Sequence, residues 1–271
     1  RKALQAGTSH FLGQNFSKAC GIKFQGVSGK EEWGWTTSWG VSTRLIGGMI
    51  MTHSDDDGLI VPPKVAPTQI VILPVTPKEE TRGEVLEACS KLKKQLEDIQ
   101  FSGSSIRVEQ DDRDLRGGEK YWQWVKKGIP LTVEIGPRDL ENKTVFVGRR
   151  DKGAQREGMN LEEFIAESAN ILENIQQSLF RKALDFRSEN SINIDDKKEL
   201  YEFFTPPSDN KAEIHGGFAY VHWDGDPQWE KEIKNELKVT IRCIPENSEE
   251  SGICIFSGKP SAGRVVLAKS Y

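Results

Sequence analysis

The stretch that decides the fold of this chain is Thr-Thr-Ser-Trp-Gly-Val-Ser-Thr-Arg-Leu-Ile-Gly-Gly-Met-Ile-Met at residues 36–51. It predicts a polar strand that ends at Trp39-Gly40, followed by an apolar helix headed by Arg44. An arginine is a poor core residue, whereas its planar fork suits phosphate and its face stacks on flat rings. The two glycines inside the helix cost about 1 kcal/mol each relative to alanine, which is tolerable where another backbone packs closely. We therefore expect Arg44 to point out of a sheet toward an anionic ligand.

Length and composition indicate a water-soluble protein with more than one domain. The chain has 271 residues, which is long for a single domain, and its 36% hydrophobic content is enough for real cores. No window approaches about 18 consecutive apolar residues, so no membrane span is expected. A net charge of −4 argues against general coating of nucleic acid but leaves room for a local basic face.

The chain begins at Arg1 without an apolar signal segment, and we expect it to be part of a longer protein. Its four cysteines lie far apart, with no Cys-x-x-Cys pair, so a disulfide framework is not expected. Cys89 shares a helical face with apolar residues and is interpreted as a small buried hydrophobe. The expected compartment is the cytoplasm or, alternatively, the interior of an organelle.

Beyond residue 67 the pattern changes to strands that alternate with helices. The apolar run at 69–75 predicts a strand covered on both faces, and the period of 79–98 predicts an amphipathic helix. Further strands are expected at 106–108, 131–135 and 144–147, and further helices at 119–127 and 161–186. This order indicates an α/β unit with a mixed or parallel sheet. Strands at 218–222, 239–244 and 265–268 with a helix at 230–237 indicate a small α+β domain.

Several long motifs follow one another in a fixed order. They are Ala-Leu-Gln-Ala-Gly-Thr-Ser-His at 3–10, Ser-Trp-Gly-Val-Ser-Thr-Arg at 38–44, His-Ser-Asp-Asp-Asp-Gly-Leu-Ile-Val-Pro-Pro at 53–63 and Gly-Ile-Pro-Leu-Thr-Val-Glu-Ile-Gly-Pro-Arg-Asp at 128–139. Together they resemble prolyl-tRNA synthetases of the archaeal and eukaryote-like type. The resemblance covers essentially the whole chain. It implies a class II ligase that uses ATP to convert proline to prolyl-adenylate and then transfers it to tRNA(Pro).

The resemblance also implies a multidomain α/β and α+β fold. Its expected parts are the end of an antiparallel-sheet catalytic domain at 1–66, an α/β anticodon-binding domain at 67–158, a connecting helix at 159–190 and a zinc-binding-like α+β domain at 191–271. The family's motif 1, motif 2 and proline-binding Thr-x-Glu would precede this chain. We therefore expect these 271 residues alone to be inactive in ATP–pyrophosphate exchange, and the full enzyme to be a homodimer.

Residue by residue, the resemblance implies an ATP site and a proline site. The matching residues are Gln5, Thr8, Ser42 and Arg44 for ATP, with magnesium, and His10 and Trp39 for proline. A carboxylate attacks the α-phosphate in this reaction, so a fixed guanidinium and neutral hydroxyl and amide groups suit the chemistry. The alternative interpretations are a structural ion pair for Arg44 and a core hydrogen bond for His10.

In the second domain the resemblance implies recognition of an unstacked anticodon, which needs stacking surfaces and groups that read base edges. Lys120, Glu134 and Arg138 are the candidates for these contacts. Trp122 and Trp124 could provide stacking, although at least one of them is expected in the core.

The third domain resembles the family's zinc-binding domain with its metal site dismantled. Asp224, Trp229, Cys254 and Ser257 stand where zinc-bearing relatives have four cysteines, and this set does not suit tetrahedral zinc. We therefore expect no zinc. The terminal Tyr271 matches a family tyrosine whose carboxylate folds back toward the catalytic domain.

Two other function classes remain open at the level of the sequence. One is a non-catalytic tRNA-binding or regulatory paralogue of the synthetase, and the other is a plain interaction domain. The intact Gln5, Thr8, His10 and Arg44 argue against the paralogue. The interaction domain is the weaker option, and failure to bind any tRNA would favour it.

Overall fold

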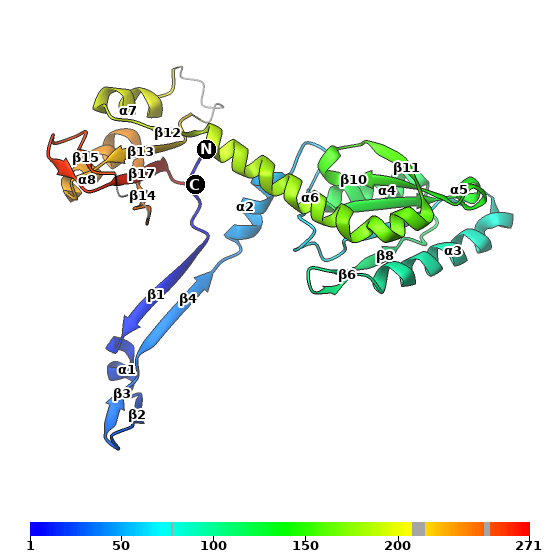
Figure 1. Ribbon diagram of the computed structural model, residues 1–271, viewed down its shortest axis with the longest axis horizontal. Coiled ribbons are helices and arrows are strands. Elements are labelled where there is room, and N and C mark those ends of the chain that lie inside the picture. Colours follow the sequence, from blue (N-terminus) through cyan, green and yellow to red (C-terminus); the bar gives the residue numbers. More distant parts are fainter. Residues whose placement is uncertain (77, 208–214, 247–249) are drawn as a thin grey trace. The chain divides into compact units, whose positions relative to one another are not determined.

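The computed structural model describes residues 1–76, 78–207, 215–246 and 250–271 (Figure 1). Its contacts divide the chain into two units, one of Arg1–Leu45 with Phe186–Tyr271 and the other of Ile46–Asp185. None of the helices in these described ranges is long and apolar enough to cross a membrane.

The unit Ile46–Asp185 is built on a five-stranded sheet in the order β11-β10-β9-β5-β8. Its strands are β5 (Ile70–Pro74), β8 (Val108–Gln110), β9 (Leu131–Ile135), β10 (Thr144–Arg149) and β11 (Arg156–Asn160). Strand β5 pairs in parallel with both β8 and β9, whereas β10 pairs antiparallel with β9 and β11. The predicted α/β unit with a mixed sheet is confirmed.

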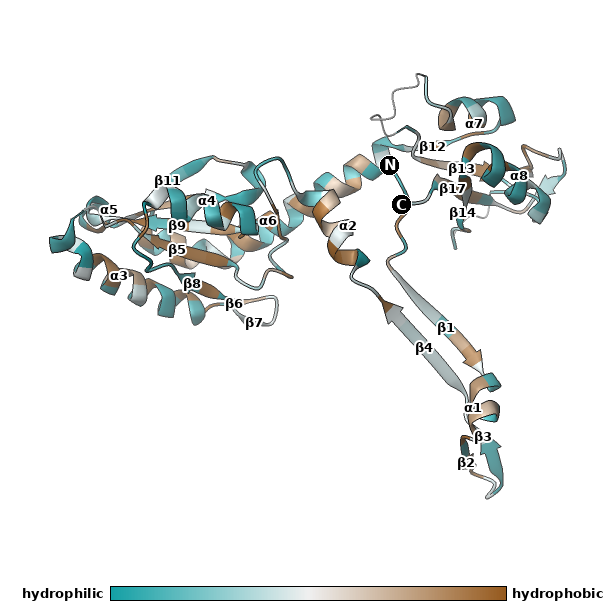
Figure 2. Cartoon of the chain, turned by 180° about the vertical axis from the view of Figure 1, so that it is seen from behind, coloured by the Kyte–Doolittle hydropathy of each residue, from teal (hydrophilic) through white to brown (hydrophobic). Residues whose placement is uncertain are grey.

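Helices cover both faces of this sheet, as the continuous apolar run of β5 predicts (Figure 2). The elements around it are α3 (Glu79–Glu97), α4 (Gly117–Lys127), α5 (Pro137–Asn142), α6 (Leu161–Glu189), the 3-10 turn η1 (Arg150–Lys152) and the hairpin of β6 (Gln100–Phe101) and β7 (Ser104–Ser105). Ile70 and Ile72 pack in one core with α3 and α6, and Val71 and Leu73 pack in another with α4. The two-residue period of the strand thus fixes which helix lies on which face.

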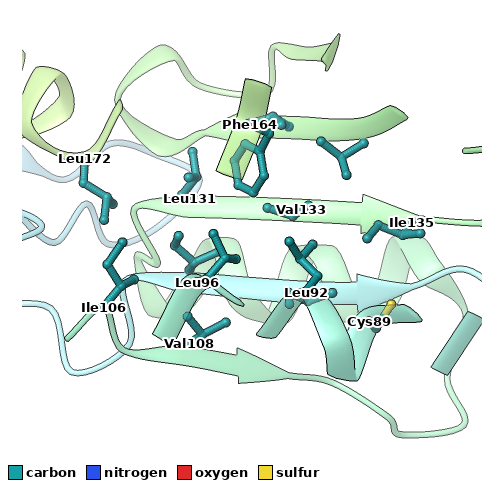
Figure 3. Close-up of a cluster of buried hydrophobic side chains, with 14 of the residues drawn as sticks. Cys89, Leu92, Leu96, Ile106, Val108, Leu131, Val133, Ile135, Phe164 and Leu172 are labelled. Carbon is teal, nitrogen blue, oxygen red and sulfur yellow. The ribbon is translucent and has the colours of Figure 1, made fainter. Parts of the chain in front are cut away.

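Cys89 lies on the buried face of α3 (Figure 3). Its side chain is fully buried beside Leu92 and Leu96 in the larger core. Burial raises the pKa of the Cys89 thiol to about 12, which keeps it protonated at neutral pH. The predicted role as a small buried hydrophobe is confirmed.

The N-terminal segments form an antiparallel ladder of β1 and β4, a short helix, a hairpin and a longer helix. Their bounds are β1 (Gly7–Gly13), α1 (Asn15–Cys20), β2 (Lys23–Gln25), β3 (Glu31–Trp33), β4 (Thr36–Val41) and α2 (Arg44–His53). The predicted helix headed by Arg44 is therefore present. The β2–β3 turn closes with a hydrogen bond from the Gly26 amide to the Lys30 carbonyl of 2.8 Å, and Gly29 adopts a φ of 76° that favours glycine.

The C-terminal residues form a small α+β domain around a four-stranded sheet in the order β12-β13-β17-β14. Its elements are β12 (Ser191–Asn193), α7 (Lys197–Phe204), β13 (Phe218–His222), α8 (Pro227–Leu237), β14 (Val239–Cys243), β15 (Gly252–Ile253), β16 (Pro260–Ser261) and β17 (Arg264–Lys269). Both α7 and α8 begin at an aspartate, Asp196 and Asp226, whose side chain accepts amide hydrogen bonds of the first turn.

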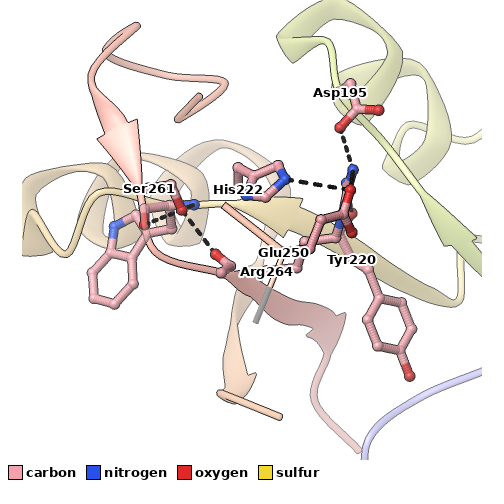
Figure 4. A network of polar contacts seen from close by, with 8 residues as sticks. Asp195, Tyr220, His222, Glu250, Ser261 and Arg264 are labelled. Carbon is pink, nitrogen blue, oxygen red and sulfur yellow. Dashed lines mark hydrogen bonds and ion pairs between the residues drawn. The ribbon is translucent and has the colours of Figure 1, made fainter. Parts of the chain in front are cut away.

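A polar cluster closes one side of this domain (Figure 4). The guanidinium of Arg264 is nearly buried, and it makes ion pairs of 2.8 Å to Asp195 and 3.1 Å to Glu250. It also donates a hydrogen bond of 3.2 Å to the carbonyl of Tyr220 on the neighbouring strand. These contacts tie the segment before α7 and the segment before β15 to the central sheet.

Candidate functional site

The register of β1 and β4 decides which predicted ligand residues share a face. Thr8 pairs with Gly40, and His10 pairs with Ser38. Paired residues of an antiparallel ladder point to the same side, and neighbours along a strand point to opposite sides. Thr8 and His10 therefore share a face. Trp39 pairs with Ser9 and lies on the opposite face, so the ladder does not bring it together with His10.

Gly40 keeps the shared face open beside Thr8. A Cβ atom at position 40 would lie 3.1 Å from the Thr8 hydroxyl oxygen, a distance closer than ordinary van der Waals contact. A side chain there would cover the polar atom that the site is expected to present. This close approach gives a local reason for the glycine in Ser38-Trp39-Gly40.

Arg44 is the first residue of α2, which begins shortly after β4 ends at Val41. Its amide lies 3.4 Å from the hydroxyl oxygen of Ser42, which accepts the hydrogen bond. Its side chain is exposed and makes no hydrogen bond or ion pair with any residue in the described ranges. The alternative interpretation of Arg44 as half of a structural ion pair is therefore not observed. Gln5 is also exposed, two residues ahead of β1.

The C-terminal end of the chain pairs with the segment that leads into Gln5. The Ala3 amide donates to the Lys269 carbonyl at 2.9 Å, and the Tyr271 amide donates to the Ala3 carbonyl at 3.0 Å. The chain end thus extends by backbone pairing along residues that directly precede the candidate ATP site. The role of the Tyr271 carboxylate stays a prediction.

Lys120, a candidate for anticodon contact, is buried in the structure. Its ammonium nitrogen donates a hydrogen bond of 3.0 Å to the backbone carbonyl of Asp111. Trp124 is buried beside it, and its indole nitrogen donates to the Asp111 carboxylate at 2.8 Å. Both side chains therefore support the loop before α4 from within, and an anticodon contact of Lys120 stays a prediction.

Trp122 differs from Trp124 because it is 44% exposed and packs edge-to-face on Tyr121, with ring centroids 5.6 Å apart. The expectation that at least one of the two tryptophans belongs to the core is confirmed by Trp124. Trp122 retains an exposed aromatic surface that is available for stacking.

Glu134 and Arg138 lie at the end of β9 and in α5. Glu134 is half-buried and forms an ion pair with Arg156 of β11. The Arg156 guanidinium in turn lies over the rings of Tyr121 and Phe146, 4.4 Å and 5.8 Å from their centroids. Arg138 is exposed, and its guanidinium has no hydrogen-bond or ion-pair partner in the described part of the chain.

Arg156 and Phe146 were not predicted as site residues. Phe146 alternates with Val145 and Val147, whose side chains enter the core, so strand periodicity places Phe146 on the opposite face. Arg156 lies in the polar segment of β11, whose sequence carries no strand signal. Its pairing with Glu134 is therefore visible only in three dimensions.

Comparison with known proteins identifies the family. Residues 69–170 match the family model described as an anticodon binding domain, and residues 209–271 match the model described as prolyl-tRNA synthetase, C-terminal. Proline–tRNA ligase 2 of Anaeromyxobacter dehalogenans is 51% identical over 100% of this chain, which covers 54% of that protein. The chain belongs to the prolyl-tRNA synthetase family.

Further matches agree with this family. Proline–tRNA ligase of Bdellovibrio bacteriovorus is 50% identical over 100% of this chain and 54% of that protein. The crystal structure of prolyl-tRNA synthetase from Cryptosporidium parvum, complexed with L-proline and AMP, superposes with a TM-score of 0.81 at 34% identity, covering 100% of this chain and 55% of that one. The chain thus spans about half the length of the curated relatives it matches.

The positions expected to correspond to the zinc site of prolyl-tRNA synthetases lie close together. The Ser257 hydroxyl donates to the Asp224 carboxylate at 2.7 Å, and this bond, with a smaller contribution from Cys254, lowers the pKa of Asp224. Trp229 stacks on Phe256, next in sequence to Ser257, with ring centroids 5.7 Å apart.

This donor set does not fit structural zinc. It offers one thiol, one carboxylate and a hydroxyl already engaged with that carboxylate, whereas structural zinc is held by four Cys or His ligands. Within the ranges that the structure describes, no group of three or more His, Cys, Asp or Glu side chains could hold a metal ion. In the structure a hydrogen bond joins Ser257 to Asp224, and aromatic stacking joins Trp229 to Phe256.

Proposed function

We propose that this chain supplies the C-terminal half of a proline–tRNA ligase. The enzyme would activate proline with ATP to prolyl-adenylate, release pyrophosphate and transfer the prolyl group to tRNA(Pro). The observation that carries the proposal is the 51% identity to a proline–tRNA ligase across the entire chain. A homodimeric, cytoplasmic enzyme is part of the proposal, by analogy with the family. The paralogue without catalysis is not favoured, because the relatives matched are proline–tRNA ligases.

The geometry supports specific roles in the activation step. The proline carboxylate attacks the α-phosphorus of ATP, and pyrophosphate leaves with negative charge accumulating on the phosphate oxygens. Arg44, which is exposed and has no side-chain partner among the described residues, would bind the triphosphate, which enters with magnesium, and would stack on adenine. Thr8 and Ser42 would provide neutral hydroxyl contacts, with Gln5 ahead of the ladder.

The proline site is proposed on the same face of the ladder. His10 shares its face with Thr8, so the two substrates would meet above adjacent side chains. Trp39 lies on the opposite face, and a contact between its ring and proline would need a path around the sheet. We therefore assign the direct contact with proline to His10 and a supporting position to Trp39. Magnesium-dependent ATP–pyrophosphate exchange with proline, measured in a full-length synthetase carrying this chain, tests the proposal.

Arg138→Gln is expected to weaken binding of a proline anticodon stem-loop by about tenfold, since a good contact between a side chain and a base edge contributes roughly 1–3 kcal/mol. The guanidinium is exposed and unpaired in the described residues, so its loss should not disturb the fold. Filter binding across a range of salt concentrations, with an unrelated stem-loop for comparison, measures the effect.

The matched control for this prediction is Arg181→Gln on α6, which removes an exposed arginine from a different helix of the same unit. Arg181→Gln should bind the proline anticodon stem-loop with an affinity within about twofold of that of the wild-type protein. Equal weakening by both changes would show a general charge effect and contradict the role of Arg138 in anticodon recognition.

Purified protein is expected to contain far less than one zinc ion per chain. The physical reason is the donor set, in which the Asp224 carboxylate is already bonded to Ser257 and only Cys254 offers sulfur. Elemental analysis after dialysis, with thermal unfolding recorded with and without a chelator, checks this prediction. One equivalent of zinc together with chelator-sensitive unfolding would refute it.

A further inference from the structure

The unit Ile46–Asp185 contains the residues that match the anticodon binding domain and is called the anticodon-binding unit below. A buried arginine of this unit, Arg150, binds the turn that follows α2. Arg150 in η1 is buried, and its guanidinium forms a two-pronged ion pair with Asp55, one prong of which measures 2.7 Å from Nη1 to Oδ2. Its remaining donors reach the backbone carbonyls of Leu59 at 2.9 Å and Gly58 at 3.2 Å. One side chain thus satisfies both a carboxylate and two carbonyls of the same turn. Removing it would leave these acceptors without their partner.

The turn itself is tightly seated on α4. Asp55 and Gly58 exchange backbone hydrogen bonds of 3.2 Å, and the Leu59 amide donates to the Lys126 carbonyl at 3.3 Å. A Cβ atom at Gly58 would lie 2.8 Å from the Cα atom of Lys126, and its φ of 142° favours glycine. The turn therefore has little freedom to move away from the anticodon-binding unit while Arg150 is in place.

Helix α2 depends on this turn because it packs weakly elsewhere in the described part of the chain. None of its residues from Arg44 to His53 is fully buried, and its apolar side chains Leu45, Ile46 and Met51 are exposed. The amide of Ser54 continues the helical hydrogen bonding to Ile50 at 2.9 Å, so no flexible linker separates the helix from Asp55. The ion pair that holds Asp55 in place therefore also holds the C-terminal end of α2 in place.

We propose that the Arg150–Asp55 ion pair is a positioning contact for proline activation. It holds the C-terminal end of α2 on the anticodon-binding unit, and because α2 is one continuous helix, it sets the direction in which Arg44 is presented at the other end. Arg150 and Asp55 touch no reacting atom and act through the helix. The inference rests on the proposed function, in which Arg44 binds ATP.

The test is ATP–pyrophosphate exchange without tRNA, in a full-length synthetase carrying this chain. Arg150→Gln is expected to reduce kcat/KM for ATP by about tenfold to a hundredfold, the range that follows from small displacements of a catalytic group, with KM for proline little changed. Asp55→Asn should cause a smaller loss in the same direction. The double variant should lose no more than Arg150→Gln, because both changes break one contact.

Arg149→Gln is the matched control, since Arg149 precedes Arg150 and forms an ion pair of 2.9 Å with Asp151 inside the same unit. The rate of ATP–pyrophosphate exchange by Arg149→Gln should stay within about twofold of the wild-type rate. A role of Arg150 confined to the fold of the anticodon-binding unit would reduce the yield of folded enzyme but leave KM for ATP unchanged.

Hydrogen exchange of the 271-residue chain provides a second measurement that needs no activity. Amides of α2 should exchange faster in Arg150→Gln and Asp55→Asn than in Arg149→Gln, while amides of β5 and β9 stay protected. Two results would overturn the inference. One is unchanged protection of the α2 amides in Arg150→Gln. The other is ATP–pyrophosphate exchange by Arg150→Gln within about twofold of the wild-type rate. If the wild-type full-length enzyme showed no proline-dependent ATP–pyrophosphate exchange, the proposed function itself would be overturned.

Discussion

Replacing Arg44 by alanine is expected to reduce ATP–pyrophosphate exchange by about a hundredfold to a thousandfold in a full-length synthetase carrying this chain. The guanidinium is the exposed cation at the head of α2, close in sequence to the ladder that carries Thr8 and His10. It would offset phosphate charge that grows as pyrophosphate leaves, and a neutral methyl group offers no such compensation. Steady-state exchange with varied ATP measures the loss.

Two controls separate this effect from a general loss of structure or charge. The Arg44 side chain has no partner among the described residues, so thermal unfolding of the 271-residue chain should be unchanged in Arg44→Ala. Lys18→Ala removes an exposed cation of α1 and should leave exchange nearly intact. Arg44→Lys keeps the charge but loses the planar fork, so it should recover only part of the activity. Full activity of Arg44→Ala would contradict its role at the nucleotide.

The sequence predicts most of the elements that carry a strong periodic signal. The buried strand expected at 69–75 appears as β5, and the helix expected at 79–98 appears as α3, Glu79–Glu97. Strand Phe218–His222 has the predicted bounds. These segments bury apolar faces whose spacing alone fixes the type of element. The strand expected at 106–108 begins two residues later, because the backbone of residue 107 is held by Gln69 before the β8 ladder starts.

The sequence does not predict strand β11 or helix α7, and the reasons differ. Strand β11, Arg-Glu-Gly-Met-Asn, has an edge position and depends on pairing with β10 rather than on a buried face of its own. That pairing is absent from a local stretch of sequence. Helix α7 does carry local signals, because Asp196 caps its first turn and the buried Leu200 and Phe204 recur at the helical spacing of four residues.

The candidate site shows the same division between local and long-range information. The motif containing Arg44 predicts an exposed guanidinium, and the structure has one. The placement of Lys120 follows instead from Asp111, nine residues earlier, whose carbonyl captures the ammonium group. The ion pair of Glu134 with Arg156 spans two strands of the sheet. Which side chains of neighbouring strands lie on the same face and pair with each other depends on the strand register, and no short motif encodes that register.

Asp111→Ala is expected to destabilise the anticodon-binding unit by about 2–4 kcal/mol. The Asp111 side chain is almost completely buried and accepts hydrogen bonds of 2.7 and 2.8 Å from Arg113 and of 2.8 Å from the indole of buried Trp124. Alanine would leave the indole N–H buried without an acceptor. Urea unfolding should show a lower midpoint with an unchanged slope. The control Asp114→Ala removes a 99% exposed carboxylate and should change the midpoint little.

The contribution of Asp111 should also depend on pH in a predictable direction. The hydrogen bonds from Arg113, with that from Trp124, hold the pKa of the Asp111 carboxyl far below its usual range in the folded protein. A depressed folded-state pKa means that the unfolded chain binds the proton first as the pH falls. The stabilisation is therefore complete above the unfolded-state pKa of about 4 and declines progressively below it. Asp111→Asn keeps the shape but cannot titrate, so the difference in unfolding free energy between the original protein and this variant should shrink as the pH falls from about 5 toward 3. A difference that stays constant over this range would show that the ionised carboxylate is not the source of the stability.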